Sequence, residues 1–267
     1  MSTKVATGIP GLDELIGGGI PTGRVILVIG GPGTGKTIMC GQFLYKGIYE
    51  YNESGVFVSL DESKDHFYRE MQQFGWDFQK AENEGKFAFI DATRMVPKAV
   101  FEEKLDKIEP KKKRNVGELL RGKRLPIDHL ISDLRAKVEQ TKISPQALTH
   151  ATRVAVDTLA ALSYRFPDVE ERRLMVADLI ESLNLLRVTT FVTTELCQLG
   201  LERTVLEEEF LVHGVIMMQT LFSGGASSRA IQIEKMREAK VNTNLVPYSI
   251  DQRGIEVYPG MSLFGEK

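Results

Sequence analysis

Apolar positions along the chain form short continuous runs, separated by segments with helical spacing. The runs are VILVI (25–29), VFVSL (56–60), FAFI (87–90), VAV (154–156) and TTFVTT (189–194). Continuous β-branched runs of this length are typical of strands buried on both faces, as in parallel sheets. Because helical patterns lie between them, we predict an α/β fold with a mainly parallel sheet sandwiched by helices.

One intervening segment carries a clear helical stripe. Residues 169–187 have apolar side chains at Leu174, Ala177, Ile180 and Leu183. This spacing predicts an amphipathic helix that turns these positions toward the core. A further helix is expected near 125–140.

The C-terminal part of the chain follows a different pattern. VIMMQTL (215–221) and AIQIEKM (230–236) flank the turn sequence SGGASS, which predicts a hairpin. Two more short strands are expected near 246–250 and 255–258. We therefore predict an antiparallel C-terminal extension at one edge of the sheet.

A length of 267 residues allows one large α/β domain or two small ones, and we predict a single domain over 1–267. The chain is 42% hydrophobic and 26% charged, with a net charge of −2, so it carries no global attraction for nucleic acid or anionic lipid. No apolar stretch approaches the roughly 18 residues of a membrane helix, and the N-terminus lacks the apolar run of a signal peptide. Two cysteines without metal-ligand spacing fit a reducing compartment, so we expect a cytoplasmic protein with no membrane partner. The four histidines (66, 129, 150 and 213) show no ligand spacing either and are expected to be surface or packing residues.

Residues 95–126 differ from the rest of the domain. Between 98 and 124 there are ten Lys or Arg and five acids, a net charge of +5, with PKKKRN at the centre. We predict a basic inserted surface segment. A solvated charged loop is the favoured interpretation, and contact with nucleic-acid phosphates is the alternative.

A phosphate-binding motif follows the first apolar run. GGPGTGKT (30–37) matches G-x-x-x-x-G-K-[ST], with a strand before it and a helix after it. Glycines let main-chain N–H groups converge on phosphate oxygens, and the start of the helix adds its positive end. Lys36 can bridge the β- and γ-phosphates, and the Thr37 hydroxyl can hold Mg²⁺. The motif therefore predicts a bound nucleoside triphosphate with Mg²⁺. The residues expected to bind the nucleotide are Gly31, Pro32, Gly33, Thr34, Gly35, Lys36, Thr37 and Ile38.

Acidic residues end three of the predicted strands. Asp157 ends RVAVD and is expected to bind Mg²⁺ with Thr37, the alternative being a cap on the next segment. Asp61 and Glu62 end VFVSL, and because parallel strands share one carboxyl edge they should face the same phosphate. One of them is expected to activate the attacking water, and we favour Glu62. The alternative is that they contact the waters around Mg²⁺ or cap the next helix. Glu195 ends TTFVTTE and could either sense the phosphate or cap a loop.

At this point the ordered motifs resemble a known family. The chain resembles the RecA-like ATPases of the KaiC type, and the first KaiC domain most of all. The similar stretches are GLDELIGGGIPTGR, the P-loop, QFLYKG, GVFVSLDES, QFGWD, EGKFAFIDA, RVAVD, TTFVTTE, EKMR and GIEVYPG. They span nearly the whole chain outside roughly 95–150. The resemblance implies a single RecA-like P-loop domain and a homo-oligomeric ring, usually hexameric, with ATP bound between subunits.

The resemblance also implies that a neighbouring subunit supplies cations to the γ-phosphate from a K-x-R motif, here Lys235 and Arg237 in IEKMRE. An Arg delivered in this way stabilises charge on the transferred phosphoryl group. Without such a neighbour the two side chains are solvated cations on an edge strand.

Three departures from the family pattern modify the expectation. Asp61 stands where the family has the first Glu of a pair, which implies slow turnover if that position is the base. Glu238 to Val241 replace the Gly-Thr-Ser-His that follows K-x-R in the family. The basic segment has no recognised counterpart, and with only one such domain we do not expect autophosphorylation.

Three functions remain open on the sequence. The first is an ATPase that hydrolyses ATP at subunit interfaces to drive a conformational or assembly switch of regulatory kind. The second is a nucleotide-gated scaffold without significant hydrolysis, whose oligomeric state is read by a regulatory protein partner. The third is a DNA-binding RecA or RadA paralogue that uses the basic segment. One fold hosts all three, so the fold alone does not choose between them.

Overall fold

The computed structural model describes residues 3–95, 127–141, 153–196, 198–199, 202–203, 205–223, 226–261 and 263. The predicted basic segment, with its PKKKRN sequence, lies outside these residues except for Met95 at its start. The single-domain prediction for 1–267 stays a prediction.

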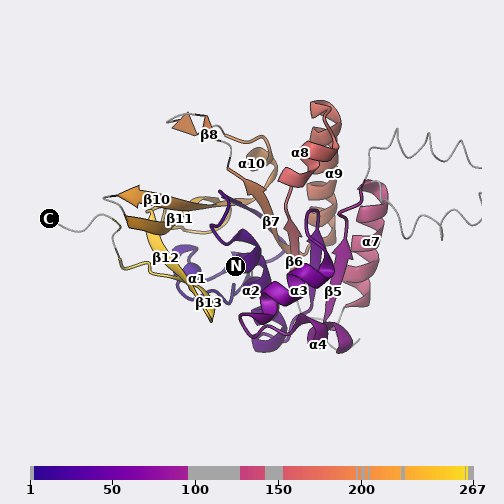
Figure 1. Cartoon of the computed structure of the whole chain (residues 1–267), viewed down its shortest axis with the longest axis horizontal. Helices are drawn as coiled ribbons and strands as arrows, with labels where there is room; N and C mark the ends of the chain where they lie inside the picture. Colours follow the sequence, from indigo (N-terminus) through magenta and orange to yellow (C-terminus); the bar gives the residue numbers. More distant parts are fainter. Residues whose placement is uncertain are drawn as a thin grey trace, which may run out of the picture.

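A nine-stranded sheet forms the centre of the molecule (Figure 1), in the order β13-β12-β11-β10-β3-β7-β6-β4-β5. Neighbouring strands from β10 to β5 pair in parallel, whereas β11, β12 and β13 join in antiparallel fashion. The prediction of a mainly parallel sheet with an antiparallel C-terminal extension is confirmed. The strands are β3 (Val25–Gly30), β4 (Gly55–Ser59), β5 (Phe87–Asp91), β6 (Arg153–Asp157), β7 (Thr189–Glu195), β10 (Gly214–Ser223), β11 (Ala226–Met236), β12 (Val246–Asp251) and β13 (Gly254–Val257).

Alternate side chains of the parallel strands enter two separate cores. Ile26 and Val28 of β3 pack on one side with α2, whereas Val25, Leu27 and Ile29 pack on the other side with α9. Both faces of the strand are therefore buried, which explains its continuous apolar sequence. The longer described helices are α2 (Lys36–Glu50), α3 (Lys64–Gln72), α4 (Phe78–Asn83), α7 (Ile127–Gln140), α8 (Ala160–Arg165) and α9 (Val169–Leu186).

Shorter elements complete the described fold. They are β1 (Lys4–Val5), α1 (Leu12–Leu15), β2 (Ile20–Pro21), β8 (Gln198–Leu199), β9 (Glu202–Arg203) and α10 (Glu208–Leu211). Of the helices in the described part of the chain, none combines the length and apolarity that a membrane crossing requires.

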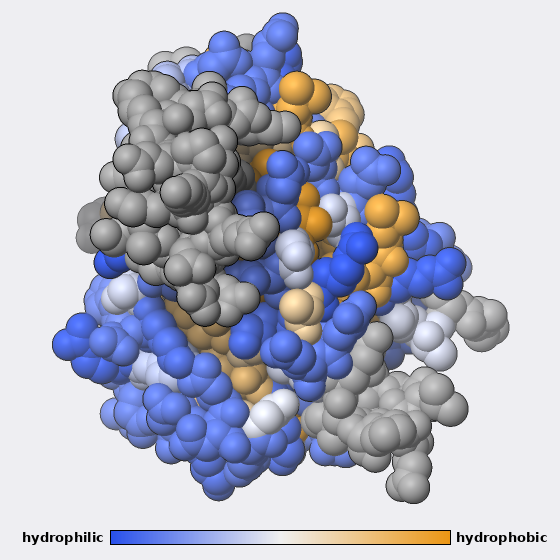
Figure 2. Space-filling model, turned by 90° about the vertical axis from the view of Figure 1, so that its right-hand side faces the viewer, coloured by the Kyte–Doolittle hydropathy of each residue, from blue (hydrophilic) through white to orange (hydrophobic). Residues whose placement is uncertain are grey.

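The predicted apolar stripe of α9 is wrong at its first position. Leu174 is 66% exposed, and the buried side chains are Met175, Val176, Leu179, Ile180 and Leu183. A three-residue spacing drifts around a helix of 3.6 residues per turn, so Leu174 and Leu183 cannot share one face. Figure 2 views the molecule from the right-hand side of Figure 1 and shows separate apolar areas among polar ones on that surface.

Candidate functional site

The loop between β3 and α2 is shaped by two glycines in the left-handed region. Gly33 has φ 75° and Gly35 has φ 90°, backbone conformations that L side chains rarely adopt. A Cβ added at Gly31 or Gly33 would meet no atom within 4 Å, whereas one at Gly35 would lie 2.6 Å from Ile250 Cδ1. The loop thus keeps open space at Gly31 and Gly33, which suits close approach of a ligand to the main chain.

Internal hydrogen bonds hold this loop in place. The Thr34 hydroxyl donates to the Gly31 carbonyl at 2.8 Å, and the Thr34 carbonyl accepts from the Tyr248 hydroxyl at 2.6 Å. Thr34 is buried and Pro32 is exposed, while Ile38 packs against the core. The main-chain N–H of Thr34 also donates to the Gly31 carbonyl, at 3.4 Å, so Thr34 closes the loop on itself.

Lys36 opens α2 and bends back over the loop. Its Nζ donates to the carbonyls of Gly30 at 2.9 Å and Gly31 at 3.2 Å. Burial lowers the pKa of Lys36, and the nearby charges of Asp157 and Glu195 oppose that shift. The ammonium therefore lies within the field of two strand-end carboxylates, which favours its charged form against the effect of burial.

Thr37 and Asp157 are joined directly. The Thr37 hydroxyl donates to Asp157 Oδ2 at 2.7 Å, and the Thr193 hydroxyl of β7 donates to Asp157 Oδ1. Burial raises the pKa of Asp157, while these two hydrogen bonds and Lys36 act to lower it. The pair that the sequence assigned to Mg²⁺ thus lies together beside Lys36. A hydroxyl next to a carboxylate is an oxygen donor set of the kind that Mg²⁺ prefers.

Asp61 and Glu62 follow β4 at the same edge of the sheet, and they differ in environment. The Ser59 hydroxyl donates to the Glu62 carbonyl at 2.6 Å and accepts from the Glu62 N–H at 2.9 Å, which fixes the turn. Asp61 is exposed, whereas Oε2 of Glu62 is buried. Burial raises the pKa of Glu62, and Asp157 and Asp61 raise it further. Glu62 therefore shares an electrostatic environment with the Asp157 site.

His66 is a neighbour of Glu62 that the sequence analysis missed. Its Nδ1 lies 3.4 Å from Glu62 Oε2, and its charge opposes the rise in the Glu62 pKa. The sequence did contain a signal for this contact, because positions 62 and 66 are four apart, a spacing that brings side chains together on a helix.

Glu195 ends β7 beside Gly30, is exposed, and contributes to the field at Lys36.

Lys235 and Arg237 lie far from the loop of their own chain. Val215 pairs with both Lys235 and Leu27, and the Arg237 N–H donates to the His213 carbonyl at 2.9 Å, next to Val25. The loop follows Gly30, five residues beyond Val25, or about 16 Å along the strand. Lys235 Nζ donates to the carbonyls of Glu209 and Val212, whereas Arg237 is exposed.

A mainly parallel sheet with a glycine-rich loop between its central strand and a helix defines a P-loop protein. A family model described as "ATPase: KaiC" matches residues 5–262. The chain therefore belongs to the KaiC-like ATPase family, as its motifs predicted.

Individual relatives agree with this assignment. The chain is 34% identical to UPF0273 protein MJ1359 of Methanocaldococcus jannaschii over 259 residues, which cover 96% of each chain. It is 30% identical to the circadian clock oscillator protein KaiC of Nostoc sp., covering 96% of this chain but only 44% of that one. The crystal structure of KaiC-like protein PH0186 from Pyrococcus horikoshii aligns with a TM-score of 0.76 and 32% identity, covering 97% of this chain and 100% of that one.

Proposed function

We propose that the protein binds ATP with Mg²⁺ and hydrolyses it slowly at interfaces between subunits, to drive a regulatory conformational or assembly switch. Membership of the KaiC-like ATPase family supports ATPase kinship in general. The observation that carries the proposal is the hydrogen bond between Thr37 and Asp157, adjacent to Lys36 and Glu62. These side chains come from three separate elements and meet at one sheet edge.

The residues present fit ATP and Mg²⁺. The main chain from Gly31 to Ile38 would hold the phosphates, and Lys36 would exchange its bonds to Gly30 and Gly31 carbonyls for phosphate oxygens. Thr37 and Asp157 would hold Mg²⁺, which neutralises charge on the phosphates when bound.

Glu62 is the proposed general base. A carboxylate with a raised pKa binds a proton more readily than an exposed one, which suits proton abstraction from water. Asp61 is exposed and shorter, so we assign it a supporting role.

We further propose that the protein forms a homo-oligomeric ring of six subunits. In this ring, Arg237 of one subunit reaches the nucleotide of the next. The support is positional, because Arg237 and the loop lie at opposite ends of β3. A single chain cannot bring them together, whereas a head-to-tail arrangement of copies can. Lys235 would first have to leave its two carbonyl partners, so Arg237 is the stronger candidate.

Glu62→Gln tests the assignment. We expect phosphate release to fall by at least about 100-fold while ATP affinity is retained, because only the proton acceptor is lost. Asp61→Asn is the matched control and should keep most of the turnover. Full turnover in Glu62→Gln, or its loss only in Asp61→Asn, would reject Glu62 as the base.

A nucleotide-gated scaffold is the second candidate, and one contact favours it. Glu238, which follows the K-x-R motif, forms an ion pair with Arg24 of its own chain. This pairing occupies the region where the family has small residues and a His. Light scattering with and without ATP and Mg²⁺, beside a phosphate assay, separates the two candidates, since a scaffold assembles without turnover. Its regulatory partner would then bind only the assembled form.

The DNA-binding alternative depends on the basic segment, which lies outside the described residues. It remains the least favoured proposal, and a single-stranded DNA titration at low salt tests it. We also propose a cytoplasmic location, in keeping with the sequence.

A further inference from the structure

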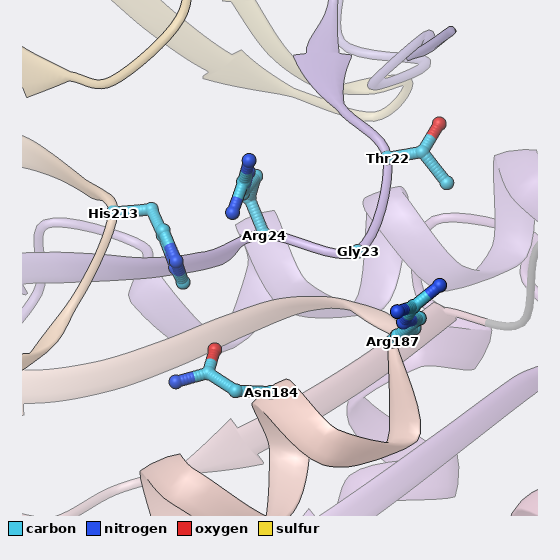
Figure 3. Close-up of a pocket in the computed structure, with 6 residues that line it drawn as sticks. All are labelled: Thr22, Gly23, Arg24, Asn184, Arg187 and His213. Carbon is cyan, nitrogen blue, oxygen red and sulfur yellow. The ribbon is translucent and has the colours of Figure 1, made fainter. Parts of the chain in front are cut away.

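A cavity of about 430 Å³ lies at the end of the sheet opposite the P-loop (Figure 3). Its lining residues are Thr22, Gly23, Arg24, Asn184, Arg187 and His213. Arg24 pairs with Glu238, and His213 Nδ1 accepts from the Val25 N–H at 3.3 Å, so both side chains already have partners within the chain. A contact with a bearing on nucleotide binding lies at the other end of the sheet, where β12 meets the P-loop.

Alternate residues of β12 face the core beside α2. Val246 and Tyr248 are buried, and Ile250 packs against the same core cluster, whereas Ser249 is half-buried. This period of two is that of a strand with one buried face. Tyr248 is 4% exposed, so its hydroxyl needs a hydrogen-bond partner inside the protein.

That partner is the P-loop itself. The Tyr248 hydroxyl donates to the main-chain carbonyl of Thr34 at 2.6 Å. Burial raises the pKa of Tyr248, so the hydroxyl keeps its proton and stays a donor across the physiological pH range. Thr34 is 2% exposed, so water has little access to replace this donor.

One hydrogen bond at this carbonyl sets the direction of a main-chain donor. The Thr34 carbonyl shares a planar trans peptide with the Gly35 N–H, and the two groups point in opposite directions. Fixing the carbonyl toward β12 therefore turns the Gly35 N–H away from β12. Gly35 has φ 90°, and glycine adopts other φ values at little steric cost, so this peptide is free to rotate unless it is held.

The extension that carries Tyr248 is also fixed to the helix that follows the loop. Gln42 of α2 is 1% exposed; its Nε2 donates to the Ile255 carbonyl at 3.0 Å, and its Oε1 accepts from the Ile255 N–H at 2.7 Å. Ile255 lies on β13 and pairs with Ile250 of β12. The β12–β13 hairpin is therefore held against both the loop and α2, which makes it a firm support for the Tyr248 hydroxyl.

We propose that Tyr248 is a positioning residue for the nucleotide. Its hydroxyl holds the Thr34–Gly35 peptide in one orientation before a ligand arrives, so that the Gly35 N–H is already directed at the phosphates. The inference rests on the proposed function, because it takes the P-loop as the ATP site. Tyr248 acts through Thr34 and not on the reacting atoms.

Tyr248→Phe removes the hydroxyl and keeps the ring. Without the hydrogen bond, the loop is in the competent arrangement for only part of the time, and the observed Kd rises in inverse proportion to that fraction. We expect the Kd for Mg²⁺·ATP, measured with a fluorescent nucleotide, to rise about 10-fold, the scale of one unmade buried hydrogen bond. The rate of hydrolysis at saturating ATP should stay the same, because bound ATP selects the competent loop.

Tyr258→Phe is the matched control. The Tyr258 hydroxyl pairs with Ser249 Oγ of the same extension at 2.7 Å instead of with the loop, so this variant should leave the Kd unchanged. Inorganic triphosphate is the second probe. It should lose affinity for Tyr248→Phe to the same extent as ATP, because the lost bond acts on the phosphate-binding loop and not on the base.

Urea unfolding checks that each variant folds. If Tyr248→Phe does not, Gln42→Met gives the decision, because it frees the hairpin from α2 and should also weaken ATP binding. Unaltered affinity in that variant would overturn the proposal.

Three results with a folded Tyr248→Phe would also overturn it. They are a lower urea stability with an unchanged Kd, a rise in Kd that Tyr258→Phe reproduces, and a loss of affinity for ATP that triphosphate does not share. An unmodified chain that binds ATP without hydrolysing it contradicts the proposed hydrolysis alone, since this test measures affinity. A chain that does not bind ATP contradicts both proposals.

Discussion

The Thr37 hydroxyl donates a 2.7 Å hydrogen bond to Oδ2 of Asp157, although the two residues are 120 positions apart. Thr193 donates to the other carboxylate oxygen. Two hydroxyls on neighbouring elements therefore fix the orientation of one buried carboxylate. Burying this carboxylate costs free energy that the nearby Lys36 ammonium offsets only in part, since the net effect is a raised pKa.

Asp157→Asn should stabilise the protein in the absence of Mg²⁺ near neutral pH. Burial raises the pKa of Asp157 above 3.8, so the folded state holds this proton more tightly than the unfolded chain. The resulting stability is complete below the unfolded pKa and is lost as pH rises through the raised pKa. Asn cannot ionise, and the two hydroxyls can donate or accept. Urea unfolding at pH 4 and pH 7.5 should show a gain in the free energy of unfolding that is larger at the higher pH.

The same substitution should have the opposite effect on ligand binding. Without the carboxylate, the affinity for Mg²⁺·ATP should fall by about 10- to 100-fold, the scale seen when metal-site partners are removed. Fluorescent-nucleotide binding with Mg²⁺ and with EDTA measures this loss. Equal affinities for the two proteins in Mg²⁺ would show that Asp157 does not help to bind the metal.

The rate of ATP hydrolysis should decline as the pH is lowered, because Glu62, the proposed base, must be ionised to accept a proton. Burial raises the pKa of Glu62 above 4.5, so the acid limb should lie above that of an exposed Glu. His66 opposes this rise, and His66→Gln should therefore move the limb to higher pH. His129→Gln on α7 is a control at an exposed histidine. If His66→Gln leaves the pH–rate profile unchanged, His66 does not influence the pKa of the catalytic base.

Gly47→Ala should destabilise the protein even though Ala is the better helix former by about 1 kcal/mol. An added Cβ would lie 2.4 Å from Arg153 Nε, and that side chain is buried and held by Glu53 and the Phe43 carbonyl. Overpacking against an immobile group costs about 1–3 kcal/mol.

Gly41→Ala in the same helix is the matched comparison. Its Cβ would meet the thioether of Met71, an adaptable side chain that can move aside. Urea unfolding should therefore rank Gly47→Ala as the less stable of the two. The reverse order would mean that Arg153 is free to relocate.

The sheet was predictable because its central strands are buried on both sides. The VILVI run fell within Val25–Gly30, and RVAVD is β6 itself. The orientation of α9 could not be predicted in the same way. The apolar positions chosen from Leu174 onward are three residues apart, and such a series winds around the helix instead of marking its buried face.

The proposed site was accessible to sequence reasoning where a motif or a strand end marked it. Lys36 and Thr37 belong to a fixed motif, and Asp157 and Glu62 follow apolar runs that end at one edge. The cavity at Arg24 has no such signal, because Asn184 and His213 reach it from segments that only tertiary packing brings together.

The strongest test of a shared site combines two inactive chains. Arg237→Ala keeps its own P-loop but lacks the cation for a neighbour, and Lys36→Ala keeps that cation but lacks a working P-loop. An arginine supplied in trans contributes about 10³- to 10⁵-fold to turnover in related chemistry, so each variant alone should be nearly inactive. Mixed subunits place an intact loop beside an intact Arg237 at some interfaces, so ATPase activity should return on mixing. Arg229→Ala, at an exposed arginine elsewhere on β11, should be active without mixing. A mixture that stays as inactive as its components would place Arg237 outside the catalytic interface, because complementation needs no more than one productive junction in each assembly.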